Sequence, residues 1–101
     1  MAGFVRICKT GEITAGSGKT VDVNGKPVAV FNVDGNFYAI NNTCAHRGGP
    51  LGEGELEGKI VVCPWHAWRY DVTTGVSEMN PAISVEKYQI RVEGDDLLIE
   101  T

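Results

Sequence analysis

Two short clusters of potential metal ligands constrain this 101-residue chain more than any other feature of its sequence. The first is Cys44-Ala45-His46 and the second is Cys63-Pro64-Trp65-His66, with a gap of sixteen residues between them. Together they use both histidines and two of the three cysteines in the chain. Thiolate and imidazole side chains bind zinc and iron–sulfur clusters. We therefore expect a fold built around a metal centre that takes one cysteine and one histidine from each of two loops.

The order of the ligands bears on which metal centre this is. A zinc site with two cysteines and two histidines usually takes the two cysteines from one arm and the two histidines from the other. Here each arm is mixed. A [2Fe–2S] cluster with two cysteines on one iron and two histidines on the other would draw one ligand of each kind from each loop. The mixed order favours the iron–sulfur cluster, and zinc remains the alternative.

The four ligand positions resemble the Rieske family, whose pattern is C-x-H, a gap of about sixteen residues, and C-x-x-H. The resemblance extends over about residues 4 to 101. It implies that one Rieske-type [2Fe–2S] cluster is the cofactor and that its ligands are Cys44, His46, Cys63 and His66. Replacing two thiolates by histidines raises the reduction potential into a band of roughly −150 to +300 mV.

Four positions near the ligands depart from or match the high-potential members of that family. Gly49 and Trp65 stand where those members carry two cysteines that form a disulfide, so this chain lacks that bridge. Trp68 replaces a serine that donates a hydrogen bond to a bridging sulfide, whereas Tyr70 matches a tyrosine that donates to a ligand cysteine. Fewer donors stabilise the reduced cluster less, which predicts a potential near the low end of the band, roughly −150 mV.

Other residues of the two loops have expected structural roles. Gly48 and Gly49 lack side chains and would let the backbone approach the cluster sulfurs closely, whereas Gly52, Gly54 and Gly58 are interpreted as ordinary turn glycines. Pro64 is expected to stiffen the second loop. Trp65 has two interpretations, packing over the cluster to exclude water or contacting a partner protein. The third cysteine, Cys8, lies in an alternating apolar run and is predicted to be a core residue.

The pattern of hydrophobic residues repeats every two positions and predicts an all-β fold. Strands are expected on both sides of the turns Asn24-Gly25, Asp34-Gly35-Asn36 and Glu93-Gly94-Asp95. They would form an antiparallel sandwich or partly open barrel. Residues 1–101 are predicted to form one domain, in which a cluster-binding subdomain of about residues 43–75 is inserted between strands of the larger sheet system. Within that insert, Lys59–Cys63 and Trp68–Val72 are predicted strands.

Composition excludes several classes of partner. The net charge of −4 and the pI near 5.0 argue against nucleic acid and anionic membranes. No apolar run approaches the length of a membrane span, and the N-terminus lacks a signal-peptide pattern, so a cytoplasmic protein is expected. Nothing in the sequence indicates more than a monomer.

The resemblance implies an electron carrier and not an enzyme, because all four ligand positions are taken and no nucleophile–base pair is evident. Proteins similar to this one pass electrons from a flavin-containing, NAD(P)H-dependent reductase to the terminal oxygenase of an aromatic-ring-hydroxylating system. Docking is then implied at His46 and His66, surrounded by Arg47, Pro50, Pro64 and Trp65. Two alternatives remain: the small Rieske-like subunit of an NADH-dependent nitrite reductase, and a zinc-loaded or metal-free interaction module.

Overall fold

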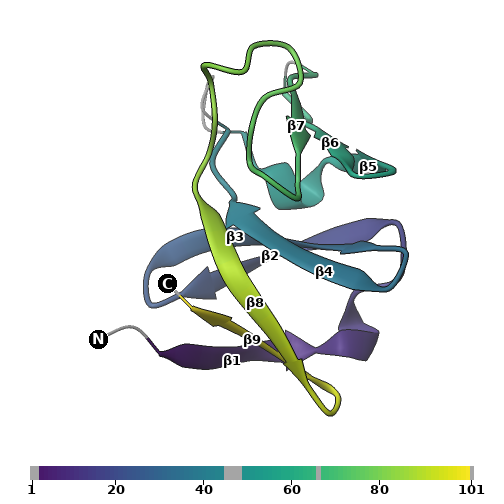
Figure 1. The fold of residues 1–101 in the computed structure, drawn as a ribbon, viewed down its shortest axis with the longest axis vertical. Helices are drawn as coiled ribbons and strands as arrows, with labels where there is room; N and C mark the ends of the chain where they lie inside the picture. Colours follow the sequence, from purple (N-terminus) through teal and green to yellow (C-terminus); the bar gives the residue numbers. More distant parts are fainter. Residues whose placement is uncertain (1–2, 45–48, 66, 101) are drawn as a thin grey trace.

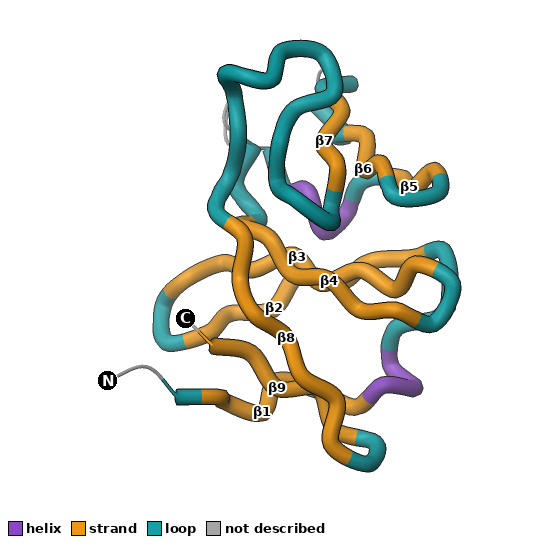
Figure 2. The backbone as a smooth tube through the Cα atoms, in the orientation of Figure 1, coloured by secondary structure: helices purple, strands orange, loops and turns teal. Residues whose placement is uncertain are grey.

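The computed structural model describes residues 3–44, 49–65 and 67–100, which form two antiparallel sheets (Figure 1). The larger sheet has six strands and the smaller has three. Figure 2 shows the larger sheet curled on itself at one end of the molecule and the smaller sheet with its loops at the other. The expected all-β fold is confirmed. No helix among the described residues is long and apolar enough to cross a membrane.

The larger sheet has the order β1-β9-β8-β4-β3-β2. Its strands are β1 (Phe4–Lys9), β2 (Ser17–Val23), β3 (Lys26–Val33), β4 (Asn36–Asn41), β8 (Lys87–Glu93) and β9 (Asp96–Glu100), and a 3-10 turn, η1 (Thr10–Glu12), follows β1.

Tight turns join the hairpins of this sheet as the sequence predicts. Asn24 and Gly25 have φ angles of 53° and 86° between β2 and β3, and Asp34 and Gly35 have φ angles of 52° and 90° between β3 and β4. Two successive residues with positive φ match the right-handed twist of the strands that they connect. The Asn-Gly and Asp-Gly pairs therefore fix the register of β3 against both neighbours.

The concave side of the larger sheet encloses one hydrophobic core. Cys8 is buried there with aliphatic residues of several strands, and the prediction that it is a core residue is confirmed. Burial raises the pKa of the Cys8 thiol, so it stays protonated near neutral pH. The fully buried residues around it include Ile13, Val28, Val30, Leu97 and Ile99.

The smaller sheet has the order β5-β6-β7 and lies between β4 and β8 in the chain. It consists of β5 (Glu55–Glu57), β6 (Ile60–Val62) and β7 (Arg69–Asp71), preceded by a 3-10 turn, η2 (Leu51–Glu53). The last two strands are shorter than predicted, and β5 is a strand that the sequence analysis did not predict. A second hydrophobic core joins this sheet to the outer face of β3 and β4 and includes Phe31, Ile40, Leu51, Val61 and Val72.

The interpretation of Gly52 and Gly54 as ordinary turn glycines is wrong. A Cβ atom on Gly52 would collide with the side chain of Thr20, and one on Gly54 would collide with the carbonyl oxygen of Val62. Both positions need glycine because another part of the backbone or a side chain passes close by. Gly58, by contrast, has a φ of +62° and no neighbour within 4 Å of an added Cβ, as expected of a turn glycine.

Candidate metal centre

Two buried cysteines mark the candidate metal centre. Cys44 follows β4, and Cys63 follows β6; each is 2% exposed, and neither forms a disulfide. Both belong to the second hydrophobic core, between the larger and the smaller sheet. The fold thus brings together two cysteines separated by most of the inserted segment. A disulfide between them, the other chemistry open to such a pair, is not formed.

Each of the two loops that carry these cysteines is closed by a backbone hydrogen bond, and the two bonds have the same pattern. The Cys44 N–H donates to the carbonyl of Gly49 at 3.0 Å, and the Cys63 N–H donates to the carbonyl of Trp68 at 2.7 Å. In both cases the acceptor lies five residues after the cysteine. The second loop also contains Ala67 with a φ of 59°, which L-residues adopt at a cost. In each loop this bond ties the cysteine to the residue five positions later.

Gly49 is the point where the two loops touch. It is buried, and a Cβ atom added there would lie 2.6 Å from Cys63 Sγ and 3.2 Å from Cγ of Trp65. The space beside the Cys63 sulfur therefore exists because position 49 has no side chain. This agrees with the expectation that Gly49 lets the backbone approach the centre closely. Gly75, in the turn after β7, would instead place a Cβ against the carbonyl oxygen of Val85.

Tyr70 contributes a polar group to this otherwise apolar site. Its side chain is fully buried on β7, and its hydroxyl oxygen lies 3.3 Å from Cys44 Sγ. A thiolate can only accept, so with Cys44 ionised the hydroxyl donates to the sulfur. The indole of Trp68 is half-buried and packs against the second hydrophobic core.

Three further predicted residues that the structure describes lie beside this site. Pro64 is exposed, Pro50 is half-buried, and Trp65 is 56% exposed even though its ring adjoins Gly49. The ring adjoins the backbone at Gly49 and is largely exposed, and both interpretations of Trp65 stay predictions. His46, His66, Arg47 and Gly48 lie outside the described residues.

Asn42 is a structural residue of the site that the sequence analysis missed. It is 7% exposed, its Oδ1 accepts the Gly52 N–H at 2.7 Å, and the Thr20 hydroxyl lies 3.1 Å from the same oxygen. Its backbone carbonyl accepts the N–H of Leu51 at 2.8 Å. Asn42 thus closes the base of the first ligand loop and ties it to β2. A single asparagine beside a predicted strand gives no sequence signal for this role.

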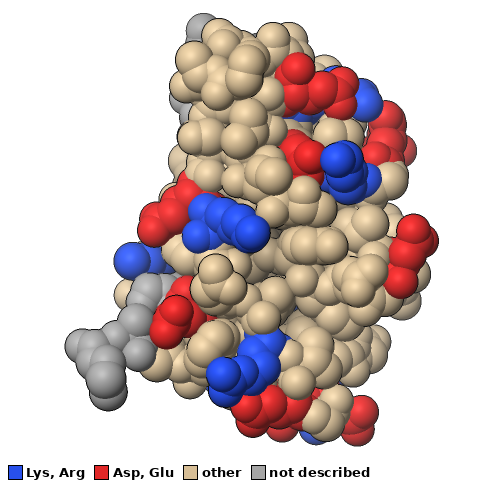
Figure 3. Space-filling view, viewed as in Figure 1, with Lys and Arg blue, Asp and Glu red and all other residues tan. Residues whose placement is uncertain are grey.

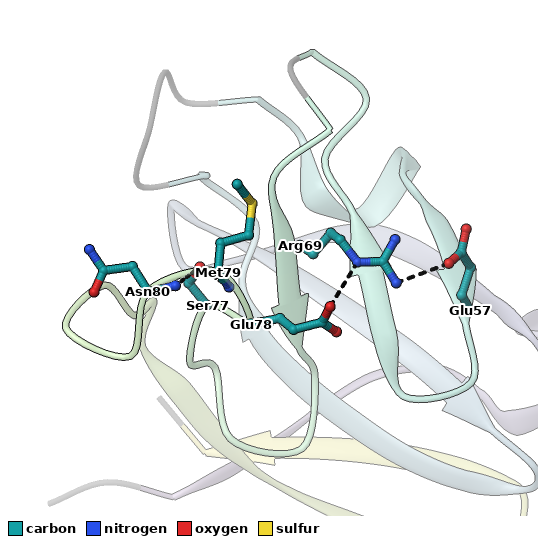
Figure 4. Close-up of polar contacts among 6 residues, drawn as sticks. All are labelled: Glu57, Arg69, Ser77, Glu78, Met79 and Asn80. Atoms are coloured by element: carbon teal, nitrogen blue, oxygen red, sulfur yellow. Dashed lines mark hydrogen bonds and ion pairs between the residues drawn. The ribbon is translucent and has the colours of Figure 1, made fainter.

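Arg69 links three segments of the smaller sheet and its loops (Figure 4). Its Nη2 lies 3.1 Å from Glu57 of β5, and its Nε lies 3.2 Å from Glu78 in the loop after β7. The hydrogen bond to Glu57 raises the pKa of the Arg69 guanidinium. Figure 4 shows Met79 and Asn80 continuing from Glu78 away from this ion pair. The pairing sits where the guanidinium is partly exposed, so it orders the loop more than it stabilises the fold.

Comparison with known proteins identifies the family of this site. The model of the Rieske [2Fe–2S] domain matches residues 3–89. The chain belongs to the Rieske [2Fe–2S] family. The ferredoxin component of biphenyl 2,3-dioxygenase from Rhodococcus jostii is 33% identical to it over 98 residues, covering 96% of this chain and 92% of the relative.

Solved structures of Rieske ferredoxins share the fold. The ferredoxin of carbazole 1,9a-dioxygenase from Nocardioides aromaticivorans has a TM-score of 0.88 at 29% identity, with 95% of each chain covered. A complex of reduced oxygenase and oxidised ferredoxin in carbazole 1,9a-dioxygenase contains a similar chain, with a TM-score of 0.87 at 28% identity and coverage of 95% and 91%. The NADH-dependent nitrite reductase small subunit from Mycobacterium tuberculosis has a TM-score of 0.91 at 22% identity, a likeness that shows the fold alone.

The described residues fit the [2Fe–2S] cluster that the family implies. Cys44 and Cys63 offer two buried sulfurs, the glycine at position 49 leaves the space beside one sulfur open, and Tyr70 offers a donor to the other. Cys44 and Cys63, with His46 and His66 from the same loops, would hold the cluster. When bound, the cluster accepts and releases one electron. A Rieske cluster is thereby the cofactor in place of the zinc ion considered above.

Proposed function

We propose that this protein carries single electrons from a flavin-containing, NAD(P)H-dependent reductase to the terminal oxygenase of an aromatic-ring-hydroxylating system. The observation that carries the proposal is the pair of buried cysteines in two identically closed loops, within a chain that is 33% identical over nearly its full length to a dioxygenase ferredoxin component. The chain acts as a component of an oxidoreductase system and not as its catalytic subunit.

The residues of the chain perform three tasks in this function. Leu51, Val61 and Val72 surround the cysteines and exclude water from the sulfurs. The Tyr70 hydroxyl donates a hydrogen bond to the Cys44 sulfur, which favours the more negative, reduced state. The closing hydrogen bonds of the two loops hold the backbone at Cys44 and Cys63.

The docking surface for both partners is proposed around His46 and His66, with Arg47, Pro50 and the exposed Pro64 and Trp65 beside them. In Figure 3 the upper left of this face carries few charged side chains, whereas acidic and basic side chains are intermixed at its upper right and over the larger sheet. A small contact region near the cofactor suits a partner that binds briefly and leaves after one transfer. The protein is proposed to be a cytoplasmic monomer, which sedimentation at micromolar concentration would test.

The test combines two matched cysteine variants with a complete electron-transfer chain. The purified reductase and oxygenase of a biphenyl dioxygenase system are mixed with this protein, and NADH oxidation and hydroxylated product are measured. Cys44→Ser should abolish product formation and the electron paramagnetic resonance signal of the reduced protein. Cys8→Ala, which changes a cysteine in the other hydrophobic core, should retain both. A wild-type protein that shows no such signal after reduction would refute the proposal.

A further inference from the structure

After β7 the chain turns back and runs antiparallel to it, so that Tyr70 and Ser77 lie directly opposite one another. The two backbone hydrogen bonds that flank this pair are both 2.9 Å long and run from the Asp71 N–H to the Val76 carbonyl and from the Glu78 N–H to the Arg69 carbonyl. We call residues 76–78 the return segment. Because β7 is three residues long and lies at the edge of the smaller sheet, the return segment supplies the pairing on its outer side. Tyr70 is therefore held between β6 and the return segment.

Tyr70 and Ser77 form the closer of the two kinds of antiparallel pair. When hydrogen bonds join the neighbours of two opposite residues and not the residues themselves, the Cα atoms are about 4.5 Å apart and the side chains approach most closely. Opposite side chains also share one face of the sheet. The Tyr70 ring lies in the second hydrophobic core with its hydroxyl at Cys44 Sγ, and Ser77, which is 3% exposed, is on the same face. The Ser77 side chain thus lies beside the base of the tyrosine side chain that touches a cluster ligand.

The hydroxyl of Ser77 is fixed by the loop that follows. Its oxygen accepts the Met79 N–H at 3.2 Å and the Asn80 N–H at 3.3 Å, and the three residues lie close together in Figure 4. A serine oxygen that accepts from N–H groups two and three positions later closes a local turn. The Ser77 N–H donates in addition to the Ile83 carbonyl at 2.8 Å. The buried hydroxyl therefore ties the return segment to the loop beyond it.

We propose that Ser77 is a positioning residue that holds the Tyr70 hydroxyl at hydrogen-bonding distance from Cys44 Sγ and thereby raises the reduction potential of the cluster. The inference rests on the proposed function, because it concerns the potential of the same electron-transfer site. Its physical basis is that the hydroxyl is the atom of Tyr70 farthest from the backbone, so a small rotation of β7 moves the hydroxyl more than the backbone. The contact is 3.3 Å long, and a hydrogen bond weakens steeply as its geometry departs from the optimum.

The test is a double-mutant cycle in which the midpoint potential is measured for wild type, Ser77→Ala, Tyr70→Phe and the double variant. Such a cycle isolates what one residue does through the other. Thr74→Ala is the matched control, because the Thr74 hydroxyl also accepts a loop N–H, from Val76 at 3.2 Å, but its side chain is exposed. Resonance Raman spectra in H₂O and D₂O give a second readout, since hydrogen bonds to the cysteine sulfurs make the iron–sulfur stretching bands sensitive to deuterium.

Ser77→Ala should lower the equilibrium constant for one-electron reduction about threefold, which corresponds to about 30 mV in midpoint potential. In the Tyr70→Phe background the same substitution should leave the potential unchanged, because the hydroxyl through which Ser77 acts is gone. The part of the deuterium shift that Tyr70→Phe abolishes should be smaller in Ser77→Ala than in wild type. Thr74→Ala should match wild type in both measurements.

An equal fall in potential with and without the Tyr70 hydroxyl would overturn the inference, because Ser77 would then act on the cluster by another route. A wild-type potential in Ser77→Ala, or an equal fall in Thr74→Ala, would overturn it as well. If Ser77→Ala binds no cluster, Ser77→Thr, which keeps the hydroxyl, decides: a wild-type potential supports the inference, and a lower one refutes it. A wild type that gives the expected potentials but passes no electrons to an oxygenase would refute the proposed function alone.

Discussion

Gly49→Ala is the substitution that tests the arrangement of the two ligand loops most directly. The added Cβ would lie 2.6 Å from Cys63 Sγ, which is 0.8 Å inside the 3.4 Å at which ordinary contact begins. The same atom would crowd the ring of Trp65 at 3.2 Å. A close-packed interior cannot absorb this overlap without moving one of the loops, so either the Cys63 sulfur or the backbone at position 49 must shift.

The expected cost follows from that overlap. Overpacking of this kind costs about 1–3 kcal/mol, and a cost of about 2 kcal/mol would lower the melting temperature of a domain of this size by about 8–16 °C. Because the displaced atom is a cluster ligand, iron and sulfide bound per chain should fall as well. Thermal unfolding followed by circular dichroism, together with iron and sulfide analysis of the same sample, measures both effects.

Gly11→Ala is the matched control. A Cβ at Gly11 meets nothing within 4 Å, and its φ is not in the left-handed region. The change should leave cluster content untouched and alter stability by less than about 1 kcal/mol, in the stabilising direction, since alanine restricts the unfolded chain. If Gly49→Ala melts with the control and binds a full complement of iron, the two loops do not depend on the close approach at this glycine.

Four further outcomes are expected. The midpoint potential should lie near roughly −150 mV, and a value above about +100 mV would contradict the account of the hydrogen-bond donors around the cluster. Tyr70→Phe removes the donor to Cys44 and should lower the midpoint potential by about 60 mV, which for a one-electron reduction corresponds to ~1.4 kcal/mol. An unchanged potential would show that this hydrogen bond does not stabilise the reduced state over the oxidised one. Asn42→Ala leaves the buried Gly52 N–H without its acceptor and should cost about 1–3 kcal/mol in denaturant unfolding. A loss under about 0.5 kcal/mol would mean that water replaces the amide. The hydrogen bond from Arg6 lowers the pKa of Asp96 in the folded state, so the stabilisation that this pair gives is present at neutral pH and is lost as the pH falls below about 4. Asp96→Asn should therefore make the free energy of unfolding fall less steeply below that pH. An equally steep fall in the variant would exclude the pair as its source.

The sequence predicts those parts of this molecule that depend on local chemistry. Asn24-Gly25 specifies a turn because successive positive φ angles are accessible to these residues, and the structure has them there. The spacing of cysteine and histidine predicted the metal centre because ligand chemistry requires those residue types. Tyr70 could be assigned to a cysteine sulfur because it matches a tyrosine of the Rieske pattern that donates to a ligand cysteine, and its hydroxyl lies 3.3 Å from Cys44 Sγ.

Parts that depend on contacts between distant segments were not predictable. The strand β5 is three residues long in a glycine-rich stretch, so its alternation is too short to detect, and its pairing with β6 decides it. Gly52 and Gly54 looked like turn residues because the residues that crowd them come from other strands. Thr20, which crowds Gly52, is distant in sequence, and Val62, which crowds Gly54, lies on the neighbouring strand of the smaller sheet. Asn42 escaped notice for the same reason.

One feature of the larger sheet bears on how this molecule can diversify. The chain leaves the sheet at the end of β4 and re-enters it at the start of β8, and these points are adjacent: Ile40 pairs with Lys87, and the Asn41 N–H donates to the Glu86 carbonyl at 2.8 Å. The whole segment between them therefore begins and ends at one place, as an oversized hairpin loop would. Loops around the metal centre can lengthen, shorten or be exchanged between related chains without changing the register of the six strands beneath. Modularity of this kind would let the reduction potential and the choice of partner evolve on a constant scaffold.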